Sequence, residues 1–240
     1  MTLKNTEIFY RYNIGLDKKH LIELVLNRFK LPEKGIAVII DSEDYNSDYY
    51  RGTWDSYGLH LNLKNGIEEL SPEFPLKIMN SRNYSTLVWL SRKASENRYA
   101  LIWMLSHELR HYYQESISDS ISKCGNFLYN TMGIVDKNFT YMDLPHEVDC
   151  ELFAYNTLKD LTSEIEAEAY LQELIAKQPS YIKLKYLDVY LFVDEMICTL
   201  EKYKDDLNLI QIRSGDIIIR NFDIENEIIK LKGVSEKSQC

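Results

Sequence analysis

The sequence predicts an α+β fold, with a small sheet in the N-terminal part and a mainly helical C-terminal part. Residues 35–41 are a continuous run of apolar, largely β-branched side chains, which is typical of a buried strand. Residues 57–63 alternate between apolar and polar side chains, which indicates a strand with one buried face. From residue 95 onwards, apolar side chains recur with the period of an α-helix in several long segments.

The N-terminal part is expected to contain a helix, a strand, a hairpin and a further strand. We expect these elements at residues 16–31, 35–41, 49–63 and 86–91. Asp17 can cap the helix and Pro32 ends it. In the second arm of the hairpin, His60 is expected on the solvent-exposed face of an edge strand. The prolines and polar residues of 64–83 indicate a loop-rich connection.

After these strands we expect an apolar helix at residues 95–118, followed by a polar and irregular segment up to Met142. The next elements are three helices, a second hairpin, a short amphipathic helix and a frayed tail. They are expected at residues 147–161, 163–178, 184–204, 207–222, 223–232 and 233–240. Pro145 stands where the first of these helices would begin. If the chain has two domains, the expected division is 1–178 and a helical C-terminal extension, 179–240.

The helix at 95–118 carries residues 107–111 (HELRH), the H-E-x-x-H pattern of zinc hydrolases. In a helix, His107 and His111 lie one turn apart on the same face, about 6 Å along the axis. At that spacing two imidazoles can bind one Zn²⁺ at about 2.0–2.1 Å each. Glu108 borders this face, where its carboxylate can take a proton from a metal-bound water. The alternative interpretation is a pair of hydrogen-bonded core histidines.

A catalytic zinc site needs a third protein ligand and keeps one position for water. The H-x-x-G-x-x-H pattern that would supply a third histidine is missing, because Gln114 and Ile117 occupy the glycine and histidine positions. The next helix offers carboxylates instead, with Glu147 and Glu151 on one face and Asp149 turned away. All three stay candidates. We favour Glu147 as the ligand and Glu151 as the carboxylate that orients a zinc-bound histidine.

Three other side chains near these residues could stabilise an oxyanion or contact the substrate. These candidates are His146, Tyr112 and Tyr155. Because the chain contains 18 tyrosines, most of them are expected to serve packing.

The motif and the helix that follows it carry a resemblance to a known family. HELRH followed by a helix of the form E-x-x-x-E-x-F-A resembles the gluzincin group of zinc metallopeptidases, and within it the compact ImmA/IrrE-like proteins. On this resemblance Glu147 corresponds to the family's metal ligand, Cys150 to its small residue and Phe153-Ala154 to its apolar–alanine pair. The resemblance covers roughly residues 16–161. It implies a zincin-like fold with a small mixed sheet, an active-site helix, a second ligand helix and one zinc ion per chain.

The pattern and the resemblance together predict a metalloendopeptidase in which His107, His111 and Glu147 hold Zn²⁺. Glu108 would activate the metal-bound water for attack on a peptide bond. Two alternatives stay open: a non-catalytic regulator or binding protein with a structural metal, and a metal-dependent amidase that acts on a small molecule. An intact Glu108 favours the two enzymes, because a scaffold has no need of a general base.

Composition restricts the partners and the compartment. The net charge of −9 and the pI near 5.2 argue against nucleic acid, which requires a basic surface. The N-terminus lacks the apolar core of a signal peptide, and no run of about 18 apolar residues predicts a membrane span. The four cysteines are scattered and predict neither a disulfide framework nor a cysteine-zinc cluster. We therefore expect a cytoplasmic protein with a peptide or protein substrate.

Overall fold

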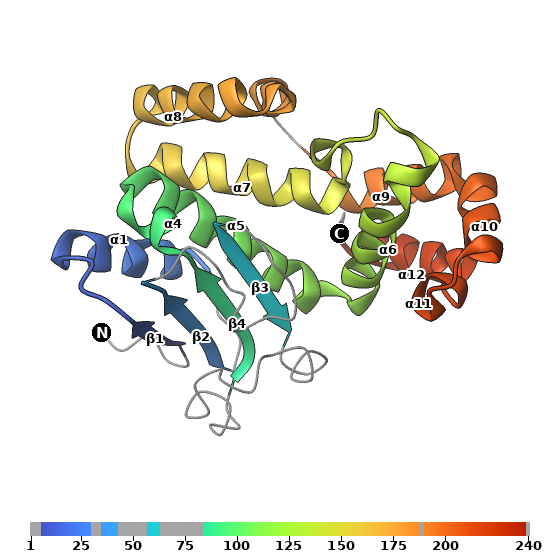
Figure 1. Cartoon of the computed structure of the whole chain (residues 1–240), viewed down its shortest axis with the longest axis horizontal. Coiled ribbons are helices and arrows are strands. Elements are labelled where there is room, and N and C mark those ends of the chain that lie inside the picture. Colours follow the sequence, from blue (N-terminus) through green and yellow to red (C-terminus); the bar gives the residue numbers. More distant parts are fainter. Residues whose placement is uncertain (1–5, 30–34, 43–56, 63–83, 188–189, 239–240) are drawn as a thin grey trace. The chain divides into compact units, whose positions relative to one another are not determined.

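The computed structural model describes residues 6–29, 35–42, 57–62, 84–187 and 190–238 (Figure 1). The chain forms two compact units, each made of two stretches. The first unit comprises Met1–Tyr112 and Phe153–Tyr170, and the second comprises Tyr113–Leu152 and Leu171–Cys240. A four-stranded sheet combined with mostly helical elements confirms the α+β class. The boundary predicted at residue 178 falls inside the second unit.

The first unit is built on a mixed sheet with the strand order β1-β2-β4-β3. Its strands are β1 (Thr6–Tyr10), β2 (Gly35–Ile40), β3 (Gly58–Asn62) and β4 (Tyr84–Leu90). The first, second and fourth strands are parallel, and β3 pairs antiparallel with β4. The strands predicted at 35–41, 57–63 and 86–91 are confirmed, whereas β1 was not predicted. The first hairpin arm, 49–54, and the connection 64–83 lie outside the described residues.

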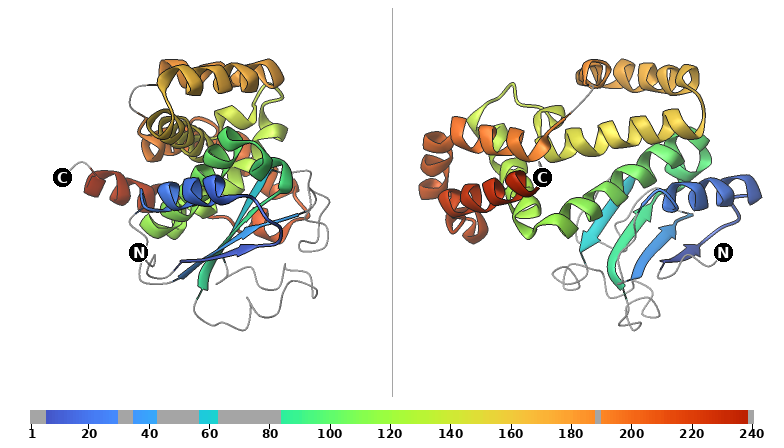
Figure 2. Two further views of the ribbon diagram at one scale, coloured as in Figure 1. Left: turned by 90° about the vertical axis from the view of Figure 1, so that its left-hand side faces the viewer. Right: turned by 180° about the vertical axis from the view of Figure 1, so that it is seen from behind.

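Both faces of the sheet are covered. Every residue of β2 is buried, as expected for a central strand with packing on either side. One face contributes Ala37, Ile39 and Trp89 to an apolar cluster. Helices α1 (Leu16–Leu26) and α5 (Arg98–Ile117) lie along the other face (Figures 1 and 2).

The helix predicted at residues 16–31 is confirmed, but it is shorter than expected. It ends at Leu26, well before Pro32. Asp17 lies in its first turn and does not cap it, because Gly15 holds the N-cap position with a φ of 84° and there is no side-chain cap hydrogen bond. A left-handed backbone of this kind favours glycine.

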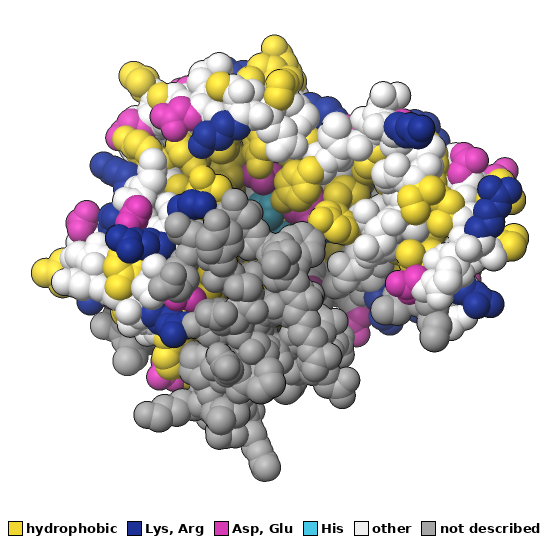
Figure 3. Space-filling view, viewed as in Figure 1, with side chains coloured by type: hydrophobic (Ala, Val, Ile, Leu, Met, Phe, Trp, Pro, Cys, Tyr) yellow, Lys and Arg dark blue, Asp and Glu magenta, His cyan; other side chains and the backbone are white. Residues whose placement is uncertain are grey.

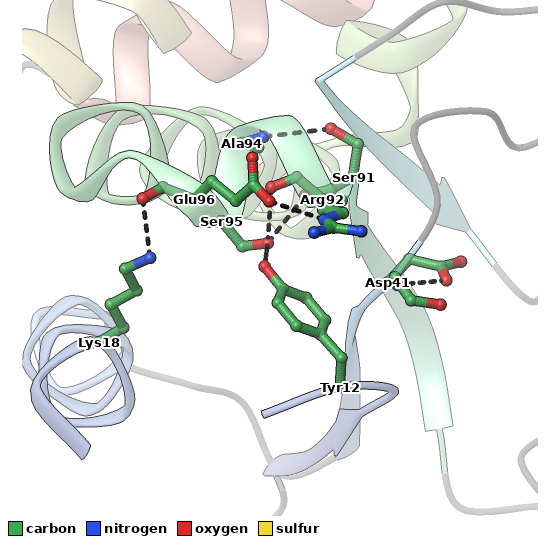
Figure 4. Close-up of polar contacts among 9 residues, drawn as sticks. Tyr12, Lys18, Asp41, Ser91, Arg92, Ala94, Ser95 and Glu96 are labelled. Atoms are coloured by element: carbon green, nitrogen blue, oxygen red, sulfur yellow. Dashed lines mark hydrogen bonds and ion pairs between the residues drawn. The ribbon is translucent and has the colours of Figure 1, made fainter. Parts of the chain in front are cut away.

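Polar contacts tie the ends of the parallel strands to the short helix α4 (Arg92–Glu96) (Figure 4). The hydroxyls of Tyr12, which follows β1, and Ser95 in α4 are 2.6 Å apart. The fully buried Asp41, which follows β2, accepts a hydrogen bond from the indole nitrogen of Trp89 at 2.8 Å. The contact of Tyr12 connects the sheet to the segment from which α5 starts, whereas the contact of Asp41 joins β2 to β4 within the sheet.

The helix predicted at 95–118 is α5, which begins at Arg98 because Asn97 caps it. The Asn97 side-chain oxygen accepts hydrogen bonds from the backbone amides of Tyr99 at 2.8 Å and Ala100 at 3.2 Å. The residues before the histidine motif are apolar and buried, as the sequence predicts. Those below a tenth exposed are Ala100, Leu101, Ile102, Trp103 and Leu105.

The second unit is mainly helical. Its elements are α6 (Asp119–Val135), η2 (Tyr141–Asp143), η3 (Pro179–Tyr186), α9 (Phe192–Lys202), α10 (Lys204–Arg213), α11 (Ile217–Arg220) and α12 (Ile224–Ser238). The 3₁₀ segments are η2 and η3. Helices α7 (Pro145–Leu161) and α8 (Glu164–Lys177) belong partly to each unit, and they confirm the helices predicted at 147–161 and 163–178.

The segment between residues 118 and 142 was predicted as irregular, and this is wrong. It contains α6, whose Ser118 N-cap accepts a hydrogen bond from the amide of Ser120. The buried side chains of α6 follow the helical repeat and enter the core of the second unit. They include Ile121, Cys124, Leu128 and Met132. Asparagine has a low helix propensity, so Asn126 and Asn130 do not favour a helix in a prediction from sequence. Both lie on the exposed side of α6.

The prediction of a second hairpin at 207–222 is also wrong, because this stretch forms α10 and α11. Leu207 and Leu209 alternate with polar residues like a strand, yet Leu207 is buried and Leu209 is 49% exposed. The acidic residues in the first turn of α10 and Arg213 in its last turn suit a helix dipole.

Two further boundaries differ from the prediction. The helix expected at 184–204 is divided between η3 and α9. The short helix expected at 223–232 is confirmed as α12, but the tail expected from Gly233 continues this helix to Ser238.

Leu128→Ala is expected to destabilise the second unit by about 2–5 kcal/mol, because it removes a fully buried side chain from the core. Tyr129→Ala, the neighbouring change at a position 49% exposed, is expected to stay within about 0.5 kcal/mol. Chemical denaturation of both variants measures the difference. Equal effects would mean that α6 does not bury this face.

Candidate metal centre

Helix α5 brings the two motif histidines together on one face. The Nε2 atoms of His107 and His111 are 3.1 Å apart, and their ring centres are 4.8 Å apart. His107 is buried and His111 is half-buried. Two nitrogens bound at about 2.0–2.1 Å to one tetrahedral zinc lie roughly 3.3 Å from each other. The donor atoms and their separation therefore fit two ligands of one Zn²⁺.

The Glu108 carboxylate is buried beside the edge strand β3. A Cβ atom added at Gly58 would lie 2.7 Å from Oε1 of Glu108 and 3.1 Å from its Cγ. The 2.7 Å contact is too short for a Cβ, so a larger residue at this position would force the Glu108 side chain to shift. The backbone of β3 thus forms one wall around the candidate general base.

His60 belongs to the same face of β3 as Gly58, and its prediction as a surface residue is wrong. Its ring is half-buried, 6.2 Å from the ring of His111 and 6.4 Å from the ring of Tyr112. Burial, together with the neighbouring His111 and His107, lowers the pKa of His60 to about 3. His60 is therefore a neutral imidazole at neutral pH.

A hydrogen bond connects His60 with the neighbouring strand β4. Its Nε2 lies 2.8 Å from the hydroxyl of Thr86, and this hydroxyl lies 3.1 Å from the carbonyl oxygen of Leu61. The first unit thus adds a third, neutral imidazole next to the histidine pair.

In the second unit, Glu147 is buried at the start of α7 and is held through both carboxylate oxygens. The hydroxyl of Tyr141 donates to Oε2 at 2.5 Å, and Nε2 of His146 lies 3.2 Å from Oε1. The His146 ring packs against Gly125 of α6, where an added Cβ would lie 2.9 Å from the ring. His146, predicted as an oxyanion or substrate contact, is thus a buried neighbour of the favoured ligand.

The other two candidate carboxylates of α7, Asp149 and Glu151, also have specific partners in the second unit. Glu151 accepts a hydrogen bond from the hydroxyl of Tyr181 at 2.8 Å. Asp149 accepts one from the side-chain amide of Gln114 at 2.8 Å, and the same amide donates to the carbonyl of His146 at 2.8 Å. Asp149 therefore has a structural partner at the end of α5.

The two predicted tyrosine contacts differ in their surroundings. Tyr112 is half-buried beside His60, close to the histidine pair. Tyr155 lies in the core of the first unit, where its ring is 6.2 Å from that of Trp103 and its hydroxyl donates to Glu168.

The candidate residues come from both units. His107, Glu108 and His111 belong to the first, whereas Glu147 and Glu151 belong to the second. Sequence reasoning missed Gly58, Tyr141 and Tyr181, and it placed His60 at the surface. The alternation along β3 could have linked Gly58 with His60, but no local pattern connects either tyrosine with its glutamate.

Comparisons of the chain with protein-family models, with curated proteins and with solved structures found no match.

Proposed function

We propose that the protein is a zinc-dependent hydrolase of peptide bonds, in which His107, His111 and Glu147 hold one Zn²⁺. The observation that carries this proposal is the 3.1 Å separation between the Nε2 atoms of His107 and His111. The residue that follows His107 is the buried Glu108. When bound, the zinc ion would lower the pKa of a water and polarise the substrate carbonyl. A pair of core histidines would have no need of the adjacent Glu108.

The chain's own residues supply the proton transfers. Glu108 accepts a proton from the attacking water and passes it to the leaving amine. The glycine at position 58 allows the Glu108 carboxylate to approach the backbone of β3. Preorganisation of this kind favours the reaction, because a displacement of about 1 Å can cost about 10²-fold in rate.

The hydrogen bonds of Gln114 support α7 as the source of the third ligand. Gln114 lies about one turn beyond His111 in the same helix. It donates to Asp149 and to the carbonyl of His146, the residue before Glu147. We keep Glu147 as the ligand and Glu151 as the carboxylate that orients a histidine.

A second candidate ligand supports the regulatory alternative. Cys150 is a buried cysteine that could hold a metal ion together with His107 and His111. If its thiolate and a carboxylate both bound the metal, the shell would contain four protein ligands and no position for water. A closed shell of this kind would belong to a non-catalytic regulator with a structural metal.

The proposed substrate is a peptide or protein. Lys and Arg side chains are scattered over the face shown in Figure 3 and form no broad basic patch among the described residues. With the net charge of −9, this distribution does not favour nucleic acid. None of the described helices is both long and apolar enough to cross a membrane. We propose the cytoplasm as the compartment, where free cysteines stay reduced.

Incubation with a mixture of unstructured peptides tests the proposal. We expect new peptide termini that disappear on addition of a zinc chelator and return when zinc is restored. Intact peptides together with hydrolysis of small amides would favour the amidase alternative. Zinc binding without hydrolysis of either substrate class would favour the regulator.

Gly58→Ala is expected to lower peptide hydrolysis by about 10–100-fold and to leave zinc binding unchanged, because the new methyl group displaces the Glu108 carboxylate. Gly133→Ala in α6 is a matched control, since an added Cβ there has no heavy atom within 4 Å. Turnover and zinc content of both variants are the measurements. Full activity in Gly58→Ala would show that β3 does not position Glu108.

A further inference from the structure

Two tyrosines lie against the candidate carboxylates of α7. We infer that Tyr141 and Tyr181 are positioning residues of the metal site, each of which fixes one glutamate through a hydrogen bond. This inference rests on the proposed function, because it concerns the residues that support the same site.

The two hydroxyls reach glutamates that are one helical turn apart. Tyr141, in η2, donates to Oε2 of Glu147 at 2.5 Å, and Tyr181, in η3, donates to Oε1 of Glu151 at 2.8 Å. The glutamates are only 8% and 2% exposed, and a buried charge without a partner would be costly. A hydrogen bond to the carboxylate favours its ionised form, which is the form that binds a cation. It also restricts the rotamer from which the carboxylate binds.

The segments that carry the tyrosines are tied to each other. The Lys183 ammonium group of η3 donates to the carbonyl of Met142 at 3.1 Å and pairs with the Asp143 carboxylate in η2. Asp143 also accepts hydrogen bonds from the amide and hydroxyl of Thr140, both at 2.7 Å, in a capping box. The two tyrosines therefore come from one connected pair of turns.

The arrangement gives the C-terminal part of the chain a role at the site. Tyr181 follows residue 178, so the segment expected to be a separate extension supplies the partner of Glu151. The two tyrosines donate to different glutamates, so the two hydroxyls can be removed one at a time.

Two phenylalanine variants test the inference, because each removes only a hydroxyl. Tyr141→Phe is expected to raise the Kd for zinc by about 10–100-fold, the usual effect of losing a hydrogen-bond partner of a metal ligand. Tyr181→Phe is expected to raise it by less, since Glu151 is not the favoured ligand. Tyr186→Phe, a tyrosine of η3 that is 78% exposed, is the matched control and should bind like the wild type.

Zinc affinity is measured by competition with a chromophoric chelator, and the unfolding of each metal-free variant is measured in parallel. A purely structural role would lower metal-free stability and leave the affinity unchanged, which would overturn the inference. Wild-type affinity in both variants, in a protein that binds zinc and cleaves peptides, would overturn the inference while the proposed function stood. A larger loss of zinc affinity in Tyr181→Phe than in Tyr141→Phe would overturn the role given to Tyr141. A wild-type protein that takes up no zinc would refute the proposed function itself, and the inference with it.

Discussion

Glu108→Gln is expected to keep the fold and the zinc and to lose peptide hydrolysis by about 10²–10⁴-fold. The amide is nearly isosteric with the carboxylate, but it cannot accept the proton of the attacking water.

Turnover of a peptide that the wild type cleaves, measured together with zinc content, checks this expectation. Glu115→Gln, about two turns further along α5, is the matched control and should keep wild-type activity. Equal turnover in Glu108→Gln and the wild type would remove Glu108 from the mechanism and place the whole enzyme class in doubt.

Glu147→Ala is expected to lose most of its zinc during purification, because two histidines alone hold the ion weakly. Glu151→Ala is expected to keep zinc under the same conditions and to lose about 10–100-fold in affinity or activity, as is typical for a residue that orients a ligand. Metal analysis after identical dialysis is the measurement. The unfolding of both metal-free variants provides the control, since each change removes a buried carboxylate.

The opposite ranking of these variants would make Glu151 the ligand and Tyr181 its main positioning residue. Asp149→Ala is expected to lower stability rather than metal content, because it breaks the contact with Gln114. Selective zinc loss in Asp149→Ala would mean that the register of α7 has been misread.

The helices that carry the candidate ligands could be predicted because short stretches of sequence contain the necessary information. The apolar residues before His107 indicate a buried helix, and H-E-x-x-H sets the histidine spacing in any straight helix. Pro145 marks the first turn of α7, where its missing amide proton is tolerated. Local rules of this kind do not depend on the rest of the fold.

Helix α6 could not be predicted in the same way, because its apolar side chains are diluted by glycines and asparagines. Leu128 and its neighbours are buried by side chains of α9 and α12, which lie far along the chain. Leu207 and Leu209 alternate like a strand, but only Leu207 enters the core. Tertiary packing decides such segments, and periodicity alone does not reveal it.

The surroundings of the candidate site were the least predictable part. The alternation along β3 correctly predicts that Leu59 and Leu61 lie on one face of the strand and His60 on the other. It does not show whether the face that carries His60 meets water or a helix. That face lies against α5, so His60 is half-buried. Tyr181 is 30 residues from Glu151, and no local sequence rule connects residues so far apart.

X-ray absorption at the zinc edge of the zinc-loaded protein tests the central claim most directly. The proposed site predicts nitrogen and oxygen neighbours at about 2.0–2.1 Å, two of them imidazoles. The same spectrum is expected from Cys150→Ser. A zinc–sulfur distance of about 2.3 Å that disappears in Cys150→Ser would contradict the proposed ligand set and identify Cys150 as a metal ligand.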